Sequence, residues 1–429
     1  MNKRIALKTI GCKLNFAETS TISREFTNRG FEIVDFNSKA DVYIVNTCTV
    51  TANADKDCRK AVHQANRNNP NAFVAMVGCF SQLHSEEANG IPGVSAVLGN
   101  DEKFNVFSHY QAFNNNTNEF EYHGQTNSLN DFHASHSTSE RTRVFLKVQD
   151  GCDYECTYCT IPLARGKSRS DTIESTMQQA KEIAKTSTRE IVLTGINTGD
   201  FGKGTNEDFF DLIRELDTLD NIDRIRISSI EPNLLTAEMI DFIADSKLFV
   251  PHFHIPLQSG SNKILKDMRR RYQHELFAEK VKKIKSTIPD CCIGVDVIVG
   301  FPTETEKDFQ ETYDFLKNLD ISYLHVFSYS PRDNTKALDL KNIVSYAQRK
   351  ERSKILRKLS DSKQNTFYNK FTGLERKVLF ESYSNGKAQG HTDNYIKVIV
   401  QGNAEMVNKI ISVKLVRNET EYVVGEVLD

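Results

Sequence analysis

The stretch GCDYECTYCTIP, residues 151–162, places three cysteine thiols within eight residues: Cys152, Cys156 and Cys159. Clustered cysteine thiolates hold iron–sulfur clusters. A four-iron cluster held by only three thiolates keeps one iron without a protein ligand, so the site suits the binding of a substrate or cofactor rather than electron transport alone. A structural zinc site is the alternative. Zinc usually takes four ligands, and the nearest histidines, His133 and His136, lie well upstream across a polar stretch.

The spacing C-x3-C-x2-C, with the aromatic Tyr158 before the last cysteine, resembles that of the radical S-adenosylmethionine enzymes. This resemblance implies a [4Fe–4S] cluster on the three cysteines and bound S-adenosylmethionine, with Tyr158 among the cofactor-binding residues. The cysteines would then be catalytic as well as metal-binding.

Length and composition restrict the class of protein. At 429 residues the chain exceeds a typical single domain, so two or three domains are expected. The apolar run near the start is too short for a signal peptide, and no segment approaches the roughly 20 apolar residues of a membrane span. We therefore expect a cytoplasmic protein, in which groups among its nine cysteines are more often metal ligands or catalysts than disulfides. Because the net charge is only −2, any nucleic acid has to be bound by a local basic surface rather than by the charge of the whole protein.

The first hundred residues alternate short β-branched strands with amphipathic helical stretches, which predicts a parallel α/β domain over residues 1–110. Ligands of such sheets gather beyond the carboxyl ends of the strands. Cys12, Cys48 and Cys79 each follow a predicted strand, in TIGC, VNTC and MVGC, and should converge on one crevice. Cys58 lies inside a predicted helix, and the pair Cys291–Cys292 begins a strand that we assign to a core.

Three further regions follow. Residues 111–140 are polar and lack periodicity, which predicts a linker, and composition favours solvation over metal binding for its histidines, His123, His133 and His136. Residues 141–370 contain six strand–helix units, typical of a partial (β/α)6 barrel, and then a long basic helix. Residues 371–429 alternate short strands with glycines, which predicts a small antiparallel β-barrel.

Nearly the whole chain resembles the radical S-adenosylmethionine methylthiotransferases. TIGCKLNFAETS, NTCTVTANAD and VGCFSQ resemble their amino-terminal domain, and GCDYECTYCTIPLARGKSRS resembles their radical domain. TIGCKLN, RGKSRS, SSIEP and HIPLQSGSNKILKDMRRRY are most similar to the branch that acts on threonylcarbamoyladenosine in tRNA. GKAQGHTDNYIKV resembles the small RNA-binding (TRAM-like) barrel of these enzymes.

This resemblance implies a second [4Fe–4S] cluster with an open iron on Cys12, Cys48 and Cys79. It also implies S-adenosylmethionine contacts at the strand ends of the barrel. Thr194, Gly195 and Asn197 would hold the amino group of the cofactor, Ser228 and Glu231 would bind its ribose, and VIVGFPTET would face its adenine.

The implied reaction is radical transfer of a methylthio group to carbon 2 of N6-threonylcarbamoyladenosine at position 37, in the tRNA anticodon loop. A flavodoxin or ferredoxin would supply electrons, and the sulfur donor stays open. Methylthiolation of isopentenyladenosine in tRNA, or of a ribosomal-protein aspartate, is the alternative within the family. A non-catalytic iron–sulfur RNA-binding or redox-sensing protein is the alternative outside it, although such proteins usually have four cysteines per cluster.

Basic residues suggest where anionic groups bind. Arg165, or one of Arg269, Arg270 and Arg271, is a candidate for the substrate carboxylate, and the three consecutive arginines could instead contact phosphate, bind the carboxylate of S-adenosylmethionine or be solvated. For RNA, the candidates are the basic helix and five residues of the terminal barrel. In the helix they are Arg349, Lys350, Arg352, Lys354, Arg357 and Lys358, and in the barrel Lys377, Tyr383, Lys387, Tyr395 and Lys397.

Overall fold

The computed structural model describes every residue except 1–2, 116–120, 123–128, 130, 138–141 and 429. Contacts divide the chain into two compact units. Unit 1 comprises residues 1–138, 145–171 and 330–335, and unit 2 comprises residues 139–144, 172–329 and 336–429. The chain passes from unit 2 back to unit 1 within strand β8 (Arg143–Lys147), so the cysteine loop after β8 belongs to unit 1.

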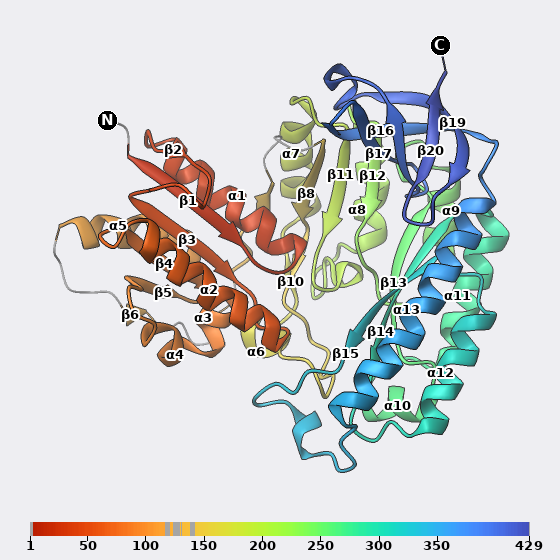
Figure 1. Cartoon of the computed structure of the whole chain (residues 1–429), viewed down its shortest axis with the longest axis horizontal. Helices are drawn as coiled ribbons and strands as arrows, with labels where there is room; N and C mark the ends of the chain where they lie inside the picture. The colour runs from red at the N-terminus through yellow and green to blue at the C-terminus, as the bar shows by residue number, and fades with distance from the viewer. Residues whose placement is uncertain (1–2, 116–120, 123–128, 130, 138–141, 429) are drawn as a thin grey trace. The chain divides into compact units, whose positions relative to one another are not determined.

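Unit 1 is built on a six-stranded sheet with the order β2-β1-β3-β4-β5-β6, in which every pair is parallel (Figure 1). Alternate residues of the central strands face opposite layers of helices. Tyr43 and Val45 pack in the core with helix α2, whereas Val42 and Ile44 pack in the core with α1 and α5. The predicted parallel α/β domain is confirmed. Its elements are β1 (Arg4–Thr9), α1 (Lys13–Thr27), β2 (Glu32–Ile33), β3 (Val42–Thr47), α2 (Ala52–Asn68), β4 (Phe73–Gly78), α3 (Cys79–Leu83), α4 (Ser85–Asn89), β5 (Ala96–Leu98), α5 (Val106–Asn114) and β6 (Glu121–Tyr122).

The segment predicted as a linker contains two short strands. One is β6 of the sheet, and the other is β7 (Ser135–His136), which pairs antiparallel with β8. The His133 ring packs 4.6 Å from that of Phe104, and His123 lies outside the described residues. After β8 come β9 (Gln149–Asp150), α6 (Ile161–Arg165) and β10 (Arg169–Ser170), with β9 and β10 antiparallel.

Unit 2 contains five of the six strands predicted for the partial barrel, β11 to β15, whereas the first, β8, is divided between the two units. β11 pairs in parallel with β12, and β13, β14 and β15 form a second parallel group. A bridge between Ile225 and Phe249 links β12 to the segment before β13. The elements are α7 (Ile173–Ala184), β11 (Glu190–Thr194), α8 (Phe209–Leu216), β12 (Arg224–Ile227), α9 (Ala237–Asp245), β13 (His252–Gln258), α10 (Asn262–Asp267), α11 (His274–Thr287), β14 (Cys292–Val299), α12 (Glu306–Asn318), β15 (Tyr323–Ser328) and α13 (Tyr346–Asn369). No helix in the described part of the chain is both long and apolar enough to cross a membrane.

The C-terminal strands close into a barrel in the order β16-β17-β18-β20-β19, which confirms the predicted barrel. Its pairs are antiparallel as predicted, except for β18 and β20, which are parallel. They are β16 (Glu375–Ser384), β17 (Lys387–Thr392), β18 (Lys397–Gln401), β19 (Ile410–Asn418) and β20 (Val423–Val427). The barrel core also includes Phe367 and Tyr368 from the end of α13 and Cys292 from β14. Cys291 and Cys292 are buried, as their assignment to a core requires. The barrel therefore shares its hydrophobic core with the rest of unit 2.

Tyr395 is the central contact between this barrel and the parallel strands of unit 2. Its ring lies 4.6 Å from the ring of His252 on β13 and stacks at 4.9 Å on His391. The guanidinium groups of Arg226 and Arg143 lie 4.8 and 5.8 Å from its centroid. These four contacts give the Tyr395 ring a packing role within unit 2, and stacking of Tyr395 on RNA bases stays a prediction. Tyr383, by contrast, is exposed.

Replacing Tyr395 with alanine should lower the stability of unit 2 by about 2 kcal/mol, because a packed aromatic ring and its cation–π contacts are lost. The measurement is the midpoint of thermal unfolding. Tyr383→Ala, in which an exposed tyrosine of the same barrel is truncated, should change stability by less than about 0.5 kcal/mol. Equal midpoints for the two variants would contradict the assigned role of Tyr395.

Candidate iron–sulfur site

The carboxyl ends of three adjacent strands bring Cys12, Cys48 and Cys79 together. In the sheet register Thr9 of β1 lies opposite Asn46 of β3, and Thr47 of β3 lies opposite Gly78 of β4. Cys48 and Cys79 directly follow the second of these pairs. Cys12 follows β1 by three residues and caps the amino end of α1. Cys58 lies in α2, packs in the core and donates its thiol to the Cys48 carbonyl at 3.6 Å, as its assignment to a helix predicts.

Gly11 leaves space for the Cys48 thiol. Its φ of +110° lies in the region that favours glycine, and a Cβ placed there would be 2.7 Å from Cys48 Cβ and 2.9 Å from Cys48 Sγ. Gly78, with φ of +97°, gives the chain the same freedom immediately before Cys79. Two of the three strand ends therefore depend on glycine to bring a cysteine into the crevice.

Polar side chains surround the three thiols. Cys12 Sγ donates to Asn15 Oδ1 at 3.6 Å, and Asn100 Nδ2 donates to Cys79 Sγ at 3.7 Å. Burial raises the pKa of Cys48 to about 12, and the neighbouring Cys79 adds to the rise. Thiols in such surroundings ionise when a metal replaces their protons. The crowding at Gly11 and the Asn100 amide that donates to Cys79 fit a cluster held by three thiolates.

The loop of Cys152, Cys156 and Cys159 is folded by backbone contacts. A Cβ on Gly151, whose φ is +67°, would lie 1.9 Å from the Lys167 carbonyl oxygen, so this position requires glycine. The Cys152 amide donates to the Gly166 carbonyl at 3.1 Å, and the Cys159 amide donates to the Cys156 carbonyl at 3.1 Å. The Tyr154 amide donates to Cys152 Sγ at 3.4 Å. An amide directed at sulfur in a tightly turned loop also fits a three-thiolate cluster.

Arg165 does not face a substrate pocket, so the prediction that it binds the substrate carboxylate is wrong. The side chain is 1% exposed and is held by Glu18 of α1 and Asp150 of β9. Burial opposes its charge, but the carboxylates and Cys79 outweigh this and hold the pKa of Arg165 well above its usual value.

The predicted S-adenosylmethionine contacts lie beyond β11 and β12 in unit 2. Asn197 follows the β11 residue Thr194 and donates to Asp200 at 2.9 Å. Ser228 follows β12, and its carbonyl faces His254. Their role with the cofactor, like those of Tyr158 and Gly195, stays a prediction.

Arg270 forms an ion pair with Glu231, and its side chain is 4% exposed. Its Nε also donates to the hydroxyl of Tyr272 at 3.1 Å. Arg270 is therefore not a solvated charge, which corrects that reading of this residue, and its contact with an anionic ligand stays a prediction. Arg269 and Arg271 are exposed.

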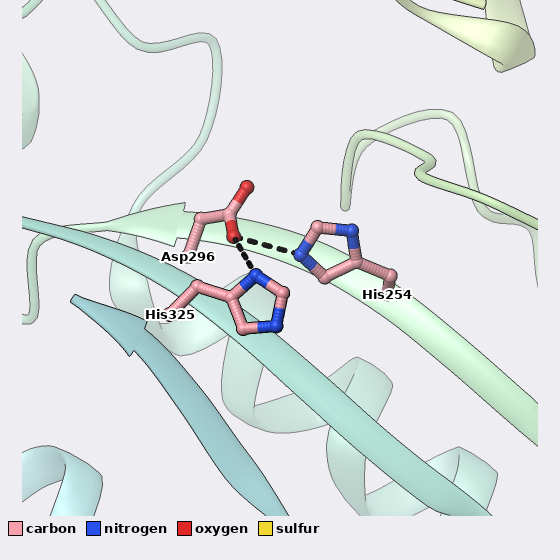
Figure 2. A group of neighbouring side chains, drawn as sticks. All are labelled: His254, Asp296 and His325. Carbon is pink, nitrogen blue, oxygen red and sulfur yellow. Dashed lines mark hydrogen bonds and ion pairs between the residues drawn. The ribbon is translucent and has the colours of Figure 1, made fainter. Parts of the chain in front are cut away.

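His254, Asp296 and His325, on β13, β14 and β15, form a polar group that sequence reasoning missed (Figure 2). His254 Nε2 lies 2.7 Å from Asp296 Oδ1, and its Nδ1 lies 3.0 Å from the Ser228 carbonyl oxygen. Both ring nitrogens of His254 therefore lie within hydrogen-bond distance of an oxygen. His325 Nδ1 lies 3.6 Å from the same carboxylate oxygen. The alternation of polar and apolar residues in HFHIPL, VDVIV and LHVF is the sequence signal that would have predicted these three side chains on the same face of the sheet.

The chain matches two family profiles. Residues 146–316 match the radical SAM superfamily, and residues 4–99 match a family described as uncharacterized protein family UPF0004. It is 38% identical to the threonylcarbamoyladenosine tRNA methylthiotransferase of Bacillus subtilis, over 98% of this chain and 96% of that one, and also 38% identical to that of Aquifex aeolicus, over 96% and 99%. A tRNA-2-methylthio-N(6)-dimethylallyladenosine synthase of Aquifex aeolicus is 29% identical, over 100% and 99%.

Among solved structures, the fold is similar to that of the radical S-adenosylmethionine methyltransferase TsrM from Kitasatospora setae. The TM-score is 0.57 at 14% identity, and the match covers 77% of each chain.

Replacing Gly11 with alanine should selectively remove metal from the crevice of Cys12, Cys48 and Cys79. The added methyl group meets the Cys48 thiol, and the left-handed backbone costs about 1–2 kcal/mol more. Iron and sulfide in anaerobically reconstituted protein should fall to about half of the wild-type content. Gly30→Ala is the matched control, because Gly30 has φ of +85° but nothing within 4 Å of its would-be Cβ. Full iron content in Gly11→Ala would contradict this assignment.

Proposed function

This chain belongs to the threonylcarbamoyladenosine tRNA methylthiotransferase family, and we propose that it adds a methylthio group to carbon 2 of N6-threonylcarbamoyladenosine at position 37 of tRNA. The observation that carries the proposal is the presence of two separate three-cysteine sites within unit 1. A single site would suffice for radical formation, whereas methylthio transfer needs a second place to hold sulfur.

Each cysteine set has one role in this proposal. Cys152, Cys156 and Cys159 hold the radical cluster, and Cys12, Cys48 and Cys79 hold the auxiliary cluster. When bound, such clusters supply an electron and an open iron for S-adenosylmethionine or sulfur. The protein binds and orients the reactants and keeps water away from them. Thr194, Gly195, Asn197, Ser228 and Glu231 are the proposed S-adenosylmethionine contacts in unit 2, together with Tyr158 in the cysteine loop.

The polar group of His254, Asp296 and His325 is a candidate contact for the modified base. Its side chains offer donors and acceptors of the kind that read the edges of an unstacked base. Phe327 follows His325 by two residues on β15, so both side chains lie on the same face of the strand. Phe327 is 47% exposed, an unusual state for a large apolar side chain, and supplies a surface on which a base can stack.

The RNA-binding surface that we favour lies on helix α13. Lys350, Lys354, Arg357 and Lys358 are exposed and line a groove of about 840 Å³ together with residues of β15 and the turn after it. Two of the six basic residues predicted on this helix are engaged elsewhere. Arg352 is buried against Glu304 at 2.7 Å, and Arg349 donates to the Tyr329 carbonyl at 2.6 Å. These four exposed cations can form ionic contacts with phosphates of the anticodon arm.

We propose that the protein acts in the cytoplasm, where its tRNA substrate is found, without a membrane partner. The radical cluster requires an electron donor, for which a small flavin or iron–sulfur protein such as a flavodoxin or ferredoxin has the necessary low potential. The source of the transferred sulfur stays open.

The proposal is tested by mass spectrometry of tRNA nucleosides from cells with and without this gene. We expect the 2-methylthio form of threonylcarbamoyladenosine to disappear when the gene is deleted and to return when the gene is supplied on a plasmid. Loss of 2-methylthio-isopentenyladenosine alone would instead assign the protein the activity named for the 29% identical synthase of Aquifex aeolicus. Loss of neither nucleoside would refute both.

Replacing Lys354 and Arg357 together with glutamate should weaken tRNA binding by about tenfold or more and make its dependence on salt shallower, because phosphate contacts are lost. The measurement is tRNA affinity at several salt concentrations. Lys181→Glu, on the exposed face of α7, is the control and should leave the affinity within about twofold. Unchanged affinity in the double variant would exclude α13 as the binding surface.

A further inference from the structure

A buried network of charged side chains lies beside the crevice of Cys12, Cys48 and Cys79. At its centre is Glu18 of α1, whose side chain is fully buried. Glu18 contacts Lys103 at 2.7 Å, Lys147 at 3.1 Å and Arg165 at 3.0 Å. Asp150 is the second carboxylate, at 2.7 Å from Lys147 and 2.9 Å from Arg165. The three cationic side chains are each 1% exposed.

The charges of this network do not balance. Three buried cations face two buried carboxylates, which leaves one positive charge in excess among the described residues. Arg169, at the rim, contacts Asp150 at 3.2 Å and adds to the excess. A buried charge without a partner is costly, because the interior does not replace its hydration. The network therefore requires a nearby anion.

Arg165 is the member of the network directed at the cysteines. Its Nη2 donates to Asn15 Oδ1 at 2.7 Å, and the same oxygen accepts from Cys12 Sγ. The Asn15 amide in turn donates to the carbonyl of Thr47, the residue before Cys48, at 3.0 Å. The Nε of Arg165 is buried and has no hydrogen-bond partner.

A four-iron cluster on three thiolates supplies the missing anion. In its oxidised state, the two positive charges of the iron–sulfide core and the three negative charges of the thiolates leave one net negative charge. That charge equals the excess in the buried network, and cluster sulfurs accept hydrogen bonds of the kind that Arg165 Nε can donate. Net charge and hydrogen bonds to sulfur are among the factors that set the reduction potential of a cluster.

We infer that Arg165 is a positioning residue that compensates the charge of the cluster on Cys12, Cys48 and Cys79 and thereby raises its reduction potential. The inference rests on the proposed function, because it presumes that auxiliary cluster. Glu18 and Asp150 hold the guanidinium in place, and Asn15 joins it to the strand ends that carry the cysteines. Reduction adds a negative charge to the cluster, so a fixed cation beside it favours the reduced state.

The test uses full-length protein in which Cys152, Cys156 and Cys159 are alanine, so that only the auxiliary cluster is loaded. Its midpoint potential is measured by redox titration monitored by electron paramagnetic resonance. Arg165→Met removes a positive charge and should shift the reduction equilibrium at least tenfold toward the oxidised cluster, which is about 59 mV for one electron. Glu18→Gln removes a negative charge and should shift it in the opposite direction. Arg165→Lys keeps the charge and should shift it less than Arg165→Met.

Arg24→Met is the matched control. Arg24 is a partly buried cation on α1, the helix that carries Glu18, and it donates to the His136 carbonyl rather than to the network. Its potential should equal that of the parent. The inference is overturned if Arg165→Met or Glu18→Gln leaves the potential unchanged, or if Glu18→Gln shifts it in the same direction as Arg165→Met. If Arg165→Met fails to fold, Glu18→Gln and Arg165→Lys decide. A parent protein that binds no cluster would refute the proposed function instead.

Discussion

The burial of one carboxylate, that of Glu18, organises the part of the molecule where the chemistry is proposed to occur. Removing a carboxylate from water is tolerated only when cations and hydrogen bonds replace its hydration. Desolvation would raise the pKa of Glu18, but Arg165, Lys103 and Lys147 outweigh it and keep the pKa well below its usual value. These three cations come from separate segments of the chain. A single buried charge therefore fixes the cysteine loop to the amino-terminal sheet, and this explains why that loop belongs to unit 1.

A comparable constraint operates in unit 2, where Arg226 is buried against Glu190 at 2.8 Å. Arg226 also lies over the ring of Tyr395, and Arg143 beside it contacts Glu381 of β16 at 2.7 Å. The terminal barrel is thus attached through desolvated ion pairs and a shared apolar core. Tyr395 and Arg143 serve this attachment, and on the outer surface of unit 2 helix α13 carries the exposed cations Lys350, Lys354, Arg357 and Lys358.

The sequence was sufficient where a feature depends on local pattern. Parallel strands with short β-branched runs could be recognised, and cysteines at the ends of such strands had to converge, because the carboxyl ends of parallel neighbours lie at one edge. It was insufficient where a feature depends on a partner far along the chain. Arg165 pairs with Glu18, 147 residues away, and Arg270 pairs with Glu231, 39 residues away. Nothing local distinguishes a buried arginine of this kind from one that binds a ligand.

These pairings also restrict how the threonylcarbamoyl group is recognised. The group carries a carboxylate and a hydroxyl, and a pocket matched to them discriminates against an apolar isopentenyl group, since its own polar atoms would otherwise stay unpaired. Arg165 and Arg270 are both held in ion pairs with protein carboxylates. In the polar group of unit 2, His254 and His325 lie 2.7 and 3.6 Å from the same Asp296 carboxylate. The pairing of these side chains, and not their charge alone, therefore limits which of them a substrate carboxylate can contact.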